Sequence, residues 1–285
     1  MQIQKLSYNL GAEILGVDLR QSLDATTFSQ IHAAFLQYSM LLFRDQPITK
    51  AQQIEFSRRF GELDNNDMAP RDRDPEFPEI LLNTNRPLPG GKPLGKGAMV
   101  WHSDRAFMCS PAMATVLHGV DLPDVGGDTL FANMYLAYDT LSEGMKKLIE
   151  GLYGVHPGPH LIIDASTPER LAATSKLSRP IAHPLVRVHP ETGRKVLYVG
   201  EKVNIIDGMT VAESVPLIRF LCAHATRPQG VYRHRWNKDD VLMWDNRCTL
   251  HMAVNDYDKT KTRYLDKTCV MGTPSGGYVY DGPMD

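Results

Sequence analysis

Short apolar or alternating segments separated by turn residues are the feature that most constrains the fold of this 285-residue chain. They begin at position 98 and continue almost to the C-terminus. The segments are Ala98–Asp104, Ala114–Val120, Thr129–Ala132, Ile181–Val188, Lys195–Val199, Tyr232–Trp236, Val241–Trp244, Thr249–Val254 and Thr262–Met271. Many short strands with turn punctuation are typical of a closed or sandwiched β architecture. The sequence therefore predicts a mainly β fold with flanking helices.

Helices and turns are expected between and before these strands. Helical periodicity and capping residues predict helices over 25–38, 49–60, 142–150 and 211–225, the second opened by a capping box of Thr49 and Gln52. Turn residues at 190–193 and at 237–240 predict two hairpins. Because no repeat or low-complexity linker divides the chain, we expect one domain over residues 1–285.

Composition excludes several classes of function. Hydrophobic residues make up 42% and charged residues 22% of the chain, and the net charge of -2 gives no electrostatic basis for binding nucleic acid. No segment reaches the roughly 18 apolar residues of a membrane span. The four cysteines are scattered without a CxxC pair, which favours a reducing, cytoplasmic location. Assembly into a homo-oligomer stays open.

One aspartate and two histidines form a candidate metal site. His102 and Asp104 are two residues apart, so on an extended strand they point to the same side, with α-carbons about 7 Å apart. His251 lies far downstream and would have to be brought to them by the fold. Two imidazoles and one carboxylate bind non-haem Fe(II) on one face and leave the other positions open. The lack of a thiolate in this set argues against structural zinc.

Several motifs together resemble the TauD/TfdA family of Fe(II)- and 2-oxoglutarate-dependent dioxygenases, and they span nearly the whole chain. The motifs are Trp101–Asp104, Gly126–Phe131, His183–Arg187, Tyr232–Trp236, Trp244–Arg247 with His251, and Arg263. The resemblance implies a double-stranded β-helix, or jelly-roll, core in which His102, Asp104 and His251 hold iron near the open end. It also implies 2-oxoglutarate and O2 as co-substrates.

The same resemblance assigns residues to the acid groups of the two organic substrates. Arg263 and Thr129 match the pair that binds the distal carboxylate of 2-oxoglutarate, and a guanidinium suits this role because it grips a carboxylate with two donors. Strand alternation places Lys267 on the same face as Arg263. In the family this neighbourhood carries an arginine that binds the acid group of the primary substrate, so Lys267 is expected to bind a substrate anion.

Three further residues are candidates for the substrate pocket. Arg105 directly follows Asp104 and offers a second cation, although a position on the outer rim of the barrel is equally compatible with the sequence. Asn66 falls where taurine dioxygenase has a substrate-contacting histidine, which argues against taurine itself. Val203 is expected to line the pocket. Substrate choice depends on the loops at 64–97 and 151–178.

The implied activity is hydroxylation of a small organic acid, either a sulfonate or an aryloxyalkanoate-type carboxylate. Oxidative decarboxylation of 2-oxoglutarate to succinate and CO2 accompanies it. Two alternatives stay open at this point. A metal-dependent hydrolase would need a general base, and none stands out. A non-catalytic barrel that binds a small acid would need Arg263 and Thr129 but would leave the three metal ligands without a role.

Overall fold

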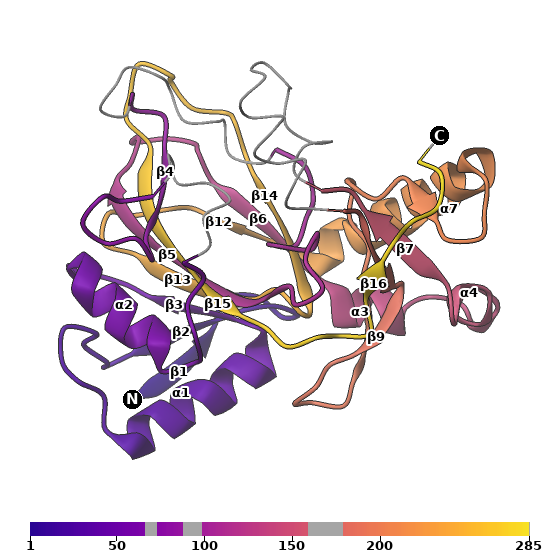
Figure 1. The fold of residues 1–285 in the computed structure, drawn as a ribbon. Coiled ribbons are helices and arrows are strands. Elements are labelled where there is room, and N and C mark those ends of the chain that lie inside the picture. The colour runs from indigo at the N-terminus through magenta and orange to yellow at the C-terminus, as the bar shows by residue number, and fades with distance from the viewer. Residues whose placement is uncertain (66–72, 88–98, 159–178, 285) are drawn as a thin grey trace.

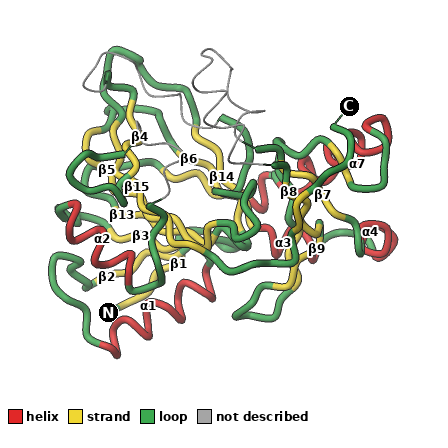
Figure 2. The backbone as a smooth tube through the Cα atoms, in the orientation of Figure 1, coloured by secondary structure: helices red, strands yellow, loops and turns green. Residues whose placement is uncertain are grey.

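Two β-sheets face each other and enclose the centre of the molecule (Figure 1, Figure 2). The computed structural model describes residues 1–65, 73–87, 99–158 and 179–284. The larger sheet runs in the order β1 (Gln2–Lys5), β2 (Ala12–Leu15), β3 (Met40–Phe43), β13 (Val241–Asp245), β5 (Ala112–Asp121), β15 (Tyr264–Met271) and β4 (Leu81–Thr84). The smaller sheet runs β12 (Val231–His234), β6 (Thr129–Asn133) and β14 (Thr249–Ala253).

Two small sheets and several helices complete the described part of the chain. The small sheets are β11 (Ile205–Ile206), β7 (Tyr153–His156), β8 (Ile181–Pro184) and β16 (Tyr278–Val279), and β10 (Lys195–Leu197) with β9 (Val186–Val188). The α-helices are α1 (Ala25–Tyr38), α2 (Lys50–Arg58), α3 (Met134–Asp139), α4 (Glu143–Ile149) and α7 (Val211–Ala225). A short 3-10 helix covers Pro228–Gly230. The predicted helices are confirmed, although α2 ends before the expected Phe60.

Strand alternation explains why the two sheets pack face to face. On β13, Leu242 and Trp244 point into the space between the sheets, whereas Val241 and Met243 point to the outer face. Trp244 packs edge to face against Phe131 of β6, with ring centroids 5.2 Å apart. An apolar layer therefore joins the larger sheet to the smaller one, and the predicted jelly-roll core is confirmed.

Helices cover the outer faces of both sheets. The α1 and α2 helices lie on the larger sheet, where Ile31 and Phe35 of α1 join an apolar cluster with Met243 (Figure 1). The capping box of Thr49 and Gln52 is present at the start of α2. On the opposite side, α3 and α7 pack together over the smaller sheet. The arrangement is thus helix, sheet, sheet, helix.

The two predicted hairpins have different outcomes. The turn at 190–193 joins β9 to β10 as an antiparallel hairpin, as predicted. The turn at 237–240 is real, but the hairpin prediction is wrong, because β12 pairs with β6 whereas β13 pairs with β3 and β5. This turn carries the chain from the smaller sheet to the larger one. Turn residues specify a reversal, and the partners of each strand decide whether a hairpin forms.

None of the helices in the described ranges has the length and apolar character needed to cross a lipid bilayer. This finding agrees with the absence of long apolar segments in the sequence.

Truncating a buried aromatic ring of α1 tests how this helix packs on the larger sheet. Phe35 is fully buried, so we expect Phe35→Ala to lower the free energy of unfolding by about 3–5 kcal/mol. Gln30 is exposed on the same helix, and Gln30→Ala should change the free energy of unfolding by less than about 0.5 kcal/mol. Urea unfolding followed by tryptophan fluorescence measures both. Equal effects of the two substitutions would contradict this packing.

Candidate metal centre

A single β-bridge brings the two ends of the candidate site together. His102 and His251 pair through two backbone hydrogen bonds, of 3.1 and 2.9 Å. Beyond His102 the chain turns, and Arg105 adopts a left-handed conformation with φ of 56°. The extended strand predicted up to Asp104 is therefore wrong over 99–104. The turn is held by Asn246, whose side-chain oxygen accepts from the Asp104 amide at 3.2 Å and whose carbonyl accepts from Ser103 Oγ at 2.8 Å.

The three predicted ligands converge in this turn. Asp104 Oδ1 lies 3.8 Å from His102 Nε2, and Asp104 Oδ2 lies 3.8 Å from His251 Nε2. All three side chains are buried, and their donor atoms lie within 4.8 Å of one another. Among the residues that the structure describes, no fourth histidine, cysteine, aspartate or glutamate joins this group. The geometry fits one divalent metal ion held by three protein donors.

The protonation states also suit a metal. His102 Nδ1 donates to the Val100 carbonyl at 2.8 Å, so the Nε2 atom that faces Asp104 carries the free lone pair. Burial lowers the pKa of His102 to about 4 and that of His251 well below its usual range. Burial opposes ionisation of Asp104, but Lys267, His251 and His102 together outweigh it and hold the pKa of that carboxyl well below its ordinary value. Two neutral imidazoles and one carboxylate are the ligand forms that a metal requires.

A chain of hydrogen bonds fixes the orientation of the Asp104 carboxylate. Thr115 of β5 donates its hydroxyl to Asp104 Oδ2 at 2.6 Å, and the Asn246 amide donates to that hydroxyl at 2.9 Å. Trp244 Nε1 donates to the Asn246 side-chain oxygen at 3.0 Å. Neither Thr115 nor Asn246 was predicted from the sequence. The available signals were a threonine within the apolar first part of a strand, at 112–117, and an asparagine in the Trp244–Arg247 motif.

Lys267 faces the interior, but its partner is a metal-site carboxylate. Its Nζ atom donates to Asp104 Oδ1 at 2.7 Å. A carboxylate offers about four lone-pair positions, so the bonds from Lys267 and Thr115 leave positions for a metal. The ammonium is therefore neutralised within the protein. It could bind a substrate anion only by sharing or giving up its bond to Asp104.

Arg263 and Thr129 lie at a separate place on the inner face of the core. Arg263 is buried and donates from Nε to the Gly127 carbonyl at 2.9 Å, and no carboxylate of the described residues lies within 4.0 Å of its guanidinium. Thr129 lies two positions from Phe131 on β6, and Phe131 pairs with His251. Thr129 and His251 therefore share the inner face of the smaller sheet. Gly127 permits the close approach, because a Cβ there would lie 3.1 Å from Arg263 Cδ.

The remaining predicted substrate residues are placed differently from one another. Arg105 forms an ion pair with the buried Asp64 carboxylate, which it shares with Arg73. Val203 is buried and lines a pocket beside His102. Asn66 lies outside the described residues, as do large parts of the two loops on which substrate choice was expected to depend. The substrate roles of these residues stay predictions.

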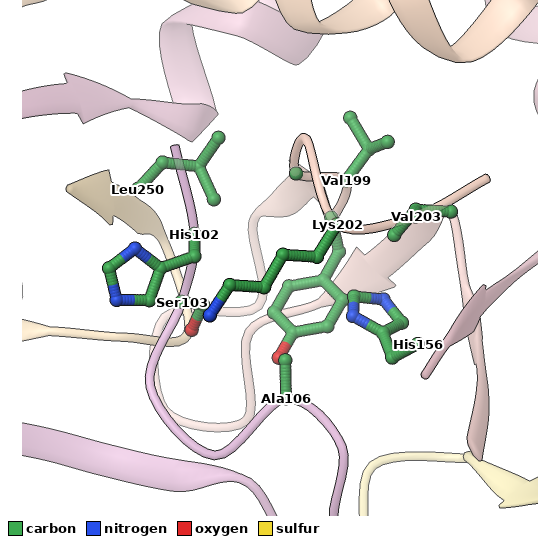
Figure 3. A pocket seen from close by; sticks show the side chains of 10 residues that line it. His102, Ser103, Ala106, His156, Val199, Lys202, Val203 and Leu250 are labelled. Atoms are coloured by element: carbon green, nitrogen blue, oxygen red, sulfur yellow. The ribbon is translucent and has the colours of Figure 1, made fainter. Parts of the chain in front are cut away.

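The pocket beside His102 is small and combines apolar walls with a few polar groups (Figure 3). Its lining consists of His102, Ser103, Ala106, His156, Tyr198, Val199, Gly200, Lys202, Val203 and Leu250. The Lys202 side chain extends across it toward His102 and Ser103 (Figure 3). Lys202 was not predicted from the sequence. Its one signal was an isolated cation next to Val203.

A jelly-roll core that carries two histidines and one carboxylate in this arrangement defines a class of enzymes, the 2-oxoglutarate-dependent dioxygenases. The chain belongs to the taurine catabolism dioxygenase TauD, TfdA family, whose family model matches residues 2–269. It is thus an oxidoreductase of the predicted class. The hydrolase and the non-catalytic barrel are not supported.

Individual relatives match over nearly their full length. The (S)-phenoxypropionate/alpha-ketoglutarate-dioxygenase of Sphingobium herbicidovorans is 35% identical and covers 96% of both chains. The alpha-ketoglutarate-dependent sulfate ester dioxygenase of Pseudomonas putida is 32% identical and covers 95% of this chain and 90% of its own. The crystal structure of a taurine dioxygenase from Burkholderia xenovorans superposes with a TM-score of 0.82 at 34% identity, covering 99% of this chain and 95% of that one.

The histidine that supports the turn after Asp104 gives a pH prediction. His183 donates from Nε2 to the carbonyls of Ala106 and Met108, at 2.9 and 3.1 Å, and burial, aided by the Arg187 charge, lowers its pKa to about 4. Between pH 6.5 and 4 the unfolded chain binds a proton at this residue and the folded protein does not. Stability should therefore fall as the pH is lowered through this window, by about 3 kcal/mol from His183 alone.

Urea unfolding of metal-free protein between pH 7.5 and 4.5 measures this slope. His183→Gln should lower stability at every pH and flatten the pH dependence, because the titrating group is gone. Parallel pH curves for the wild type and His183→Gln would contradict the assignment. His156 also faces His183, with ring centroids 5.2 Å apart, and it supplies part of the slope that remains.

Proposed function

We propose that this chain uses Fe(II), 2-oxoglutarate and O2 to hydroxylate a small organic acid, with a sulfonate, a sulfate ester or an aryloxyalkanoate as the substrate class. One C–H bond of the substrate becomes C–OH, while 2-oxoglutarate loses CO2 and becomes succinate. The buried cluster of His102, Asp104 and His251 carries this proposal, because three donors on one side leave the other side for substrates.

His102, Asp104 and His251 are the proposed ligands of the iron. Imidazole and carboxylate ligands suit Fe(II), and the bound metal supplies the activation of O2 that the protein's own side chains lack. Thr115 and Asn246 hold the carboxylate in one orientation, and the hydrogen bond to Val100 fixes the ring of His102. Such supporting contacts raise metal affinity and keep the ligands in place.

Arg263 and Thr129 are the proposed binding residues for the distal carboxylate of 2-oxoglutarate. The Arg263 guanidinium is buried and has no carboxylate partner among the described residues, so an anionic ligand would remove an unfavourable buried charge. Thr129 adds a hydroxyl on the same inner face as His251. The co-substrate would then extend from Arg263 toward the metal ligands.

The substrate class follows from the relatives and from the charge of the site. The relatives named above are described as acting on phenoxypropionate and on sulfate esters, which are small molecules with one acid group. Cations surround the candidate metal centre of this chain, with Lys202 in the adjoining pocket and Lys267 on Asp104. An anionic substrate is electrostatically suited to such surroundings.

Anaerobic addition of Fe(II) and 2-oxoglutarate tests the metal assignment. We expect a visible metal-to-ligand charge-transfer band, followed by succinate release when O2 is admitted. His102→Ala should abolish both, whereas Lys238→Met, which removes an exposed lysine in the turn at 237–240, should keep them. A protein that binds Fe(II) and 2-oxoglutarate but forms neither the band nor succinate would refute the proposal.

Arg263→Gln tests the co-substrate assignment. Loss of the guanidinium removes a charge-assisted contact worth about 2 kcal/mol or more, so the KM for 2-oxoglutarate should rise about 30-fold or more. Lys261→Gln, which removes an exposed cation two residues earlier, is the matched control and should leave KM unchanged. Steady-state succinate formation measures both. An unaltered KM in Arg263→Gln would place the distal carboxylate elsewhere.

A further inference from the structure

Four buried polar side chains near His102 carry atoms without a hydrogen-bond partner. The atoms are His156 Nε2, Tyr198 Oη, Arg187 Nη1 and His183 Nδ1, and within the described chain none of them has a partner. They lie together, since both the His156 and the His183 rings lie within 5.6 Å of the Tyr198 ring, centroid to centroid. Buried polar atoms are rarely left unsatisfied, so such a concentration indicates that a ligand or solvent completes them.

Two of these four residues adjoin the pocket that Lys202 crosses. His156 and Tyr198 line it directly, and Arg187 stacks on the Tyr198 ring from behind, with Cζ 4.1 Å from the ring centroid. Neither Lys202 nor Arg187 has a carboxylate of the described residues within 4.0 Å. We call the part of the pocket that is lined by His156, Tyr198 and Lys202, with Arg187 behind the Tyr198 ring, the Lys202 chamber.

The cations around the candidate metal centre divide into two groups. Lys267 is paired with Asp104, and Arg105 is paired with Asp64, so both cations have a carboxylate partner inside the protein. Arg263 is buried and Lys202 is partly buried, and neither has a carboxylate within 4.0 Å among the described residues. Arg263 is accounted for by the distal carboxylate of 2-oxoglutarate. A partly buried cation without such a partner calls for a second anion at Lys202.

We propose that the Lys202 chamber holds the acid group of the primary substrate, with Lys202 as its counter-ion and the Tyr198 hydroxyl as a hydrogen-bond donor. This inference rests on the proposed function and names the anion-binding residues for it. The apolar walls formed by Val199, Val203 and Leu250 would contact the organic part of the same molecule. An apolar pocket with a few convergent polar groups is the usual design of a small-ligand site.

This assignment replaces the sequence-based expectation for Lys267. The ammonium of Lys267 already donates to a metal-site carboxylate, and moving it to a substrate would leave Asp104 with one donor fewer. Lys202 can bind an anion without breaking any ion pair of the described residues. A carboxylate and a sulfate group share the required chemistry, so the substrate panel has to distinguish them.

A bromide soak tests the anion site without knowledge of the substrate. Crystals of the protein loaded with metal and 2-oxoglutarate are soaked in sodium bromide, and anomalous scattering locates the ions. We expect bromide in contact with Lys202 Nζ in the wild type and none there in Lys202→Met. An empty chamber in the wild type, or a bromide that persists in Lys202→Met, would overturn the proposal. The same maps report whether the variant is folded.

Kinetics test the substrate role. The panel consists of phenoxyacetate, 2-phenoxypropionate, hexyl sulfate and hexanesulfonate, each with a neutral analogue such as phenoxyacetamide or hexanol. For the acid that the wild type uses best, Lys202→Met should raise KM about 30-fold or more. Lys202→Arg should restore most of the affinity, Tyr198→Phe should have a smaller effect, and Lys238→Met should have none. The ratio of KM for the neutral analogue to KM for the acid should fall strongly only in the variant that lacks the Lys202 charge.

Succinate release without a primary substrate distinguishes failure of the proposed function from failure of the Lys202 chamber assignment. Lys238→Met, which lies outside the pocket, should keep the charge-transfer band and the slow turnover of 2-oxoglutarate alone, because its metal ligands and Arg263 are intact. If the wild type lacks these signals, the proposed function fails. If the wild type has them and Lys202→Met leaves both KM and the preference for acids unchanged, only the Lys202 chamber assignment fails.

Discussion

The carboxylate of Asp104 is the point at which the separate parts of the site meet. It accepts a hydrogen bond from the Thr115 hydroxyl on β5 and another from the Lys267 ammonium on β15. It also faces the imidazoles of His102 and His251, whose backbones form a β-bridge. Burying a carboxylate is unfavourable unless donors surround it. Its position therefore requires the larger sheet, the turn after His102 and the β14 strand to be in register with one another.

Strand parity explains how such distant residues reach one place. On β5, Thr115 points inward while Ala114 and Val116 pack under the helices, and on β14, His251 points inward while Leu250 packs outward. A shift of either strand by one residue would send the polar side chain into the apolar layer. Apolar packing between each sheet and its covering helices thus fixes the register of the strands. This register keeps the polar side chains of the site on the inner faces of the sheets.

Period and residue type were sufficient to predict the helices and most strands, and residue type marked His102, Asp104 and His251 as candidate metal ligands. The jelly-roll core that brings these three residues together was implied by the resemblance to the TauD/TfdA family. The sequence failed where the outcome depended on contacts distant in the chain. The predicted strand up to Asp104 ends in a turn, because the Asp104 amide donates to the side-chain oxygen of Asn246, which is far downstream in the chain. The expected hairpin at 237–240 is a crossover because its two strands have partners in different sheets. Alternation could place Lys267 inside but could not reveal its partner.

Ion pairs within the fold decide which cations are free to bind a ligand. These ion pairs cannot be predicted from the sequence, because their partners are distant in the chain. Lys267, Arg105 and Lys202 cannot be told apart in the sequence as partners of a substrate anion. In the fold, Lys267 and Arg105 form ion pairs with carboxylates, whereas Lys202 has no carboxylate within 4.0 Å among the residues that the structure describes. A compact ammonium suits position 267, because it can donate to one oxygen of Asp104 and leave the remaining lone pairs to a metal. A guanidinium there would present a wide fork better matched to gripping both oxygens of an external acid. The lysine at 267 thus favours support of the metal-site carboxylate and shifts recognition of the substrate anion toward Lys202.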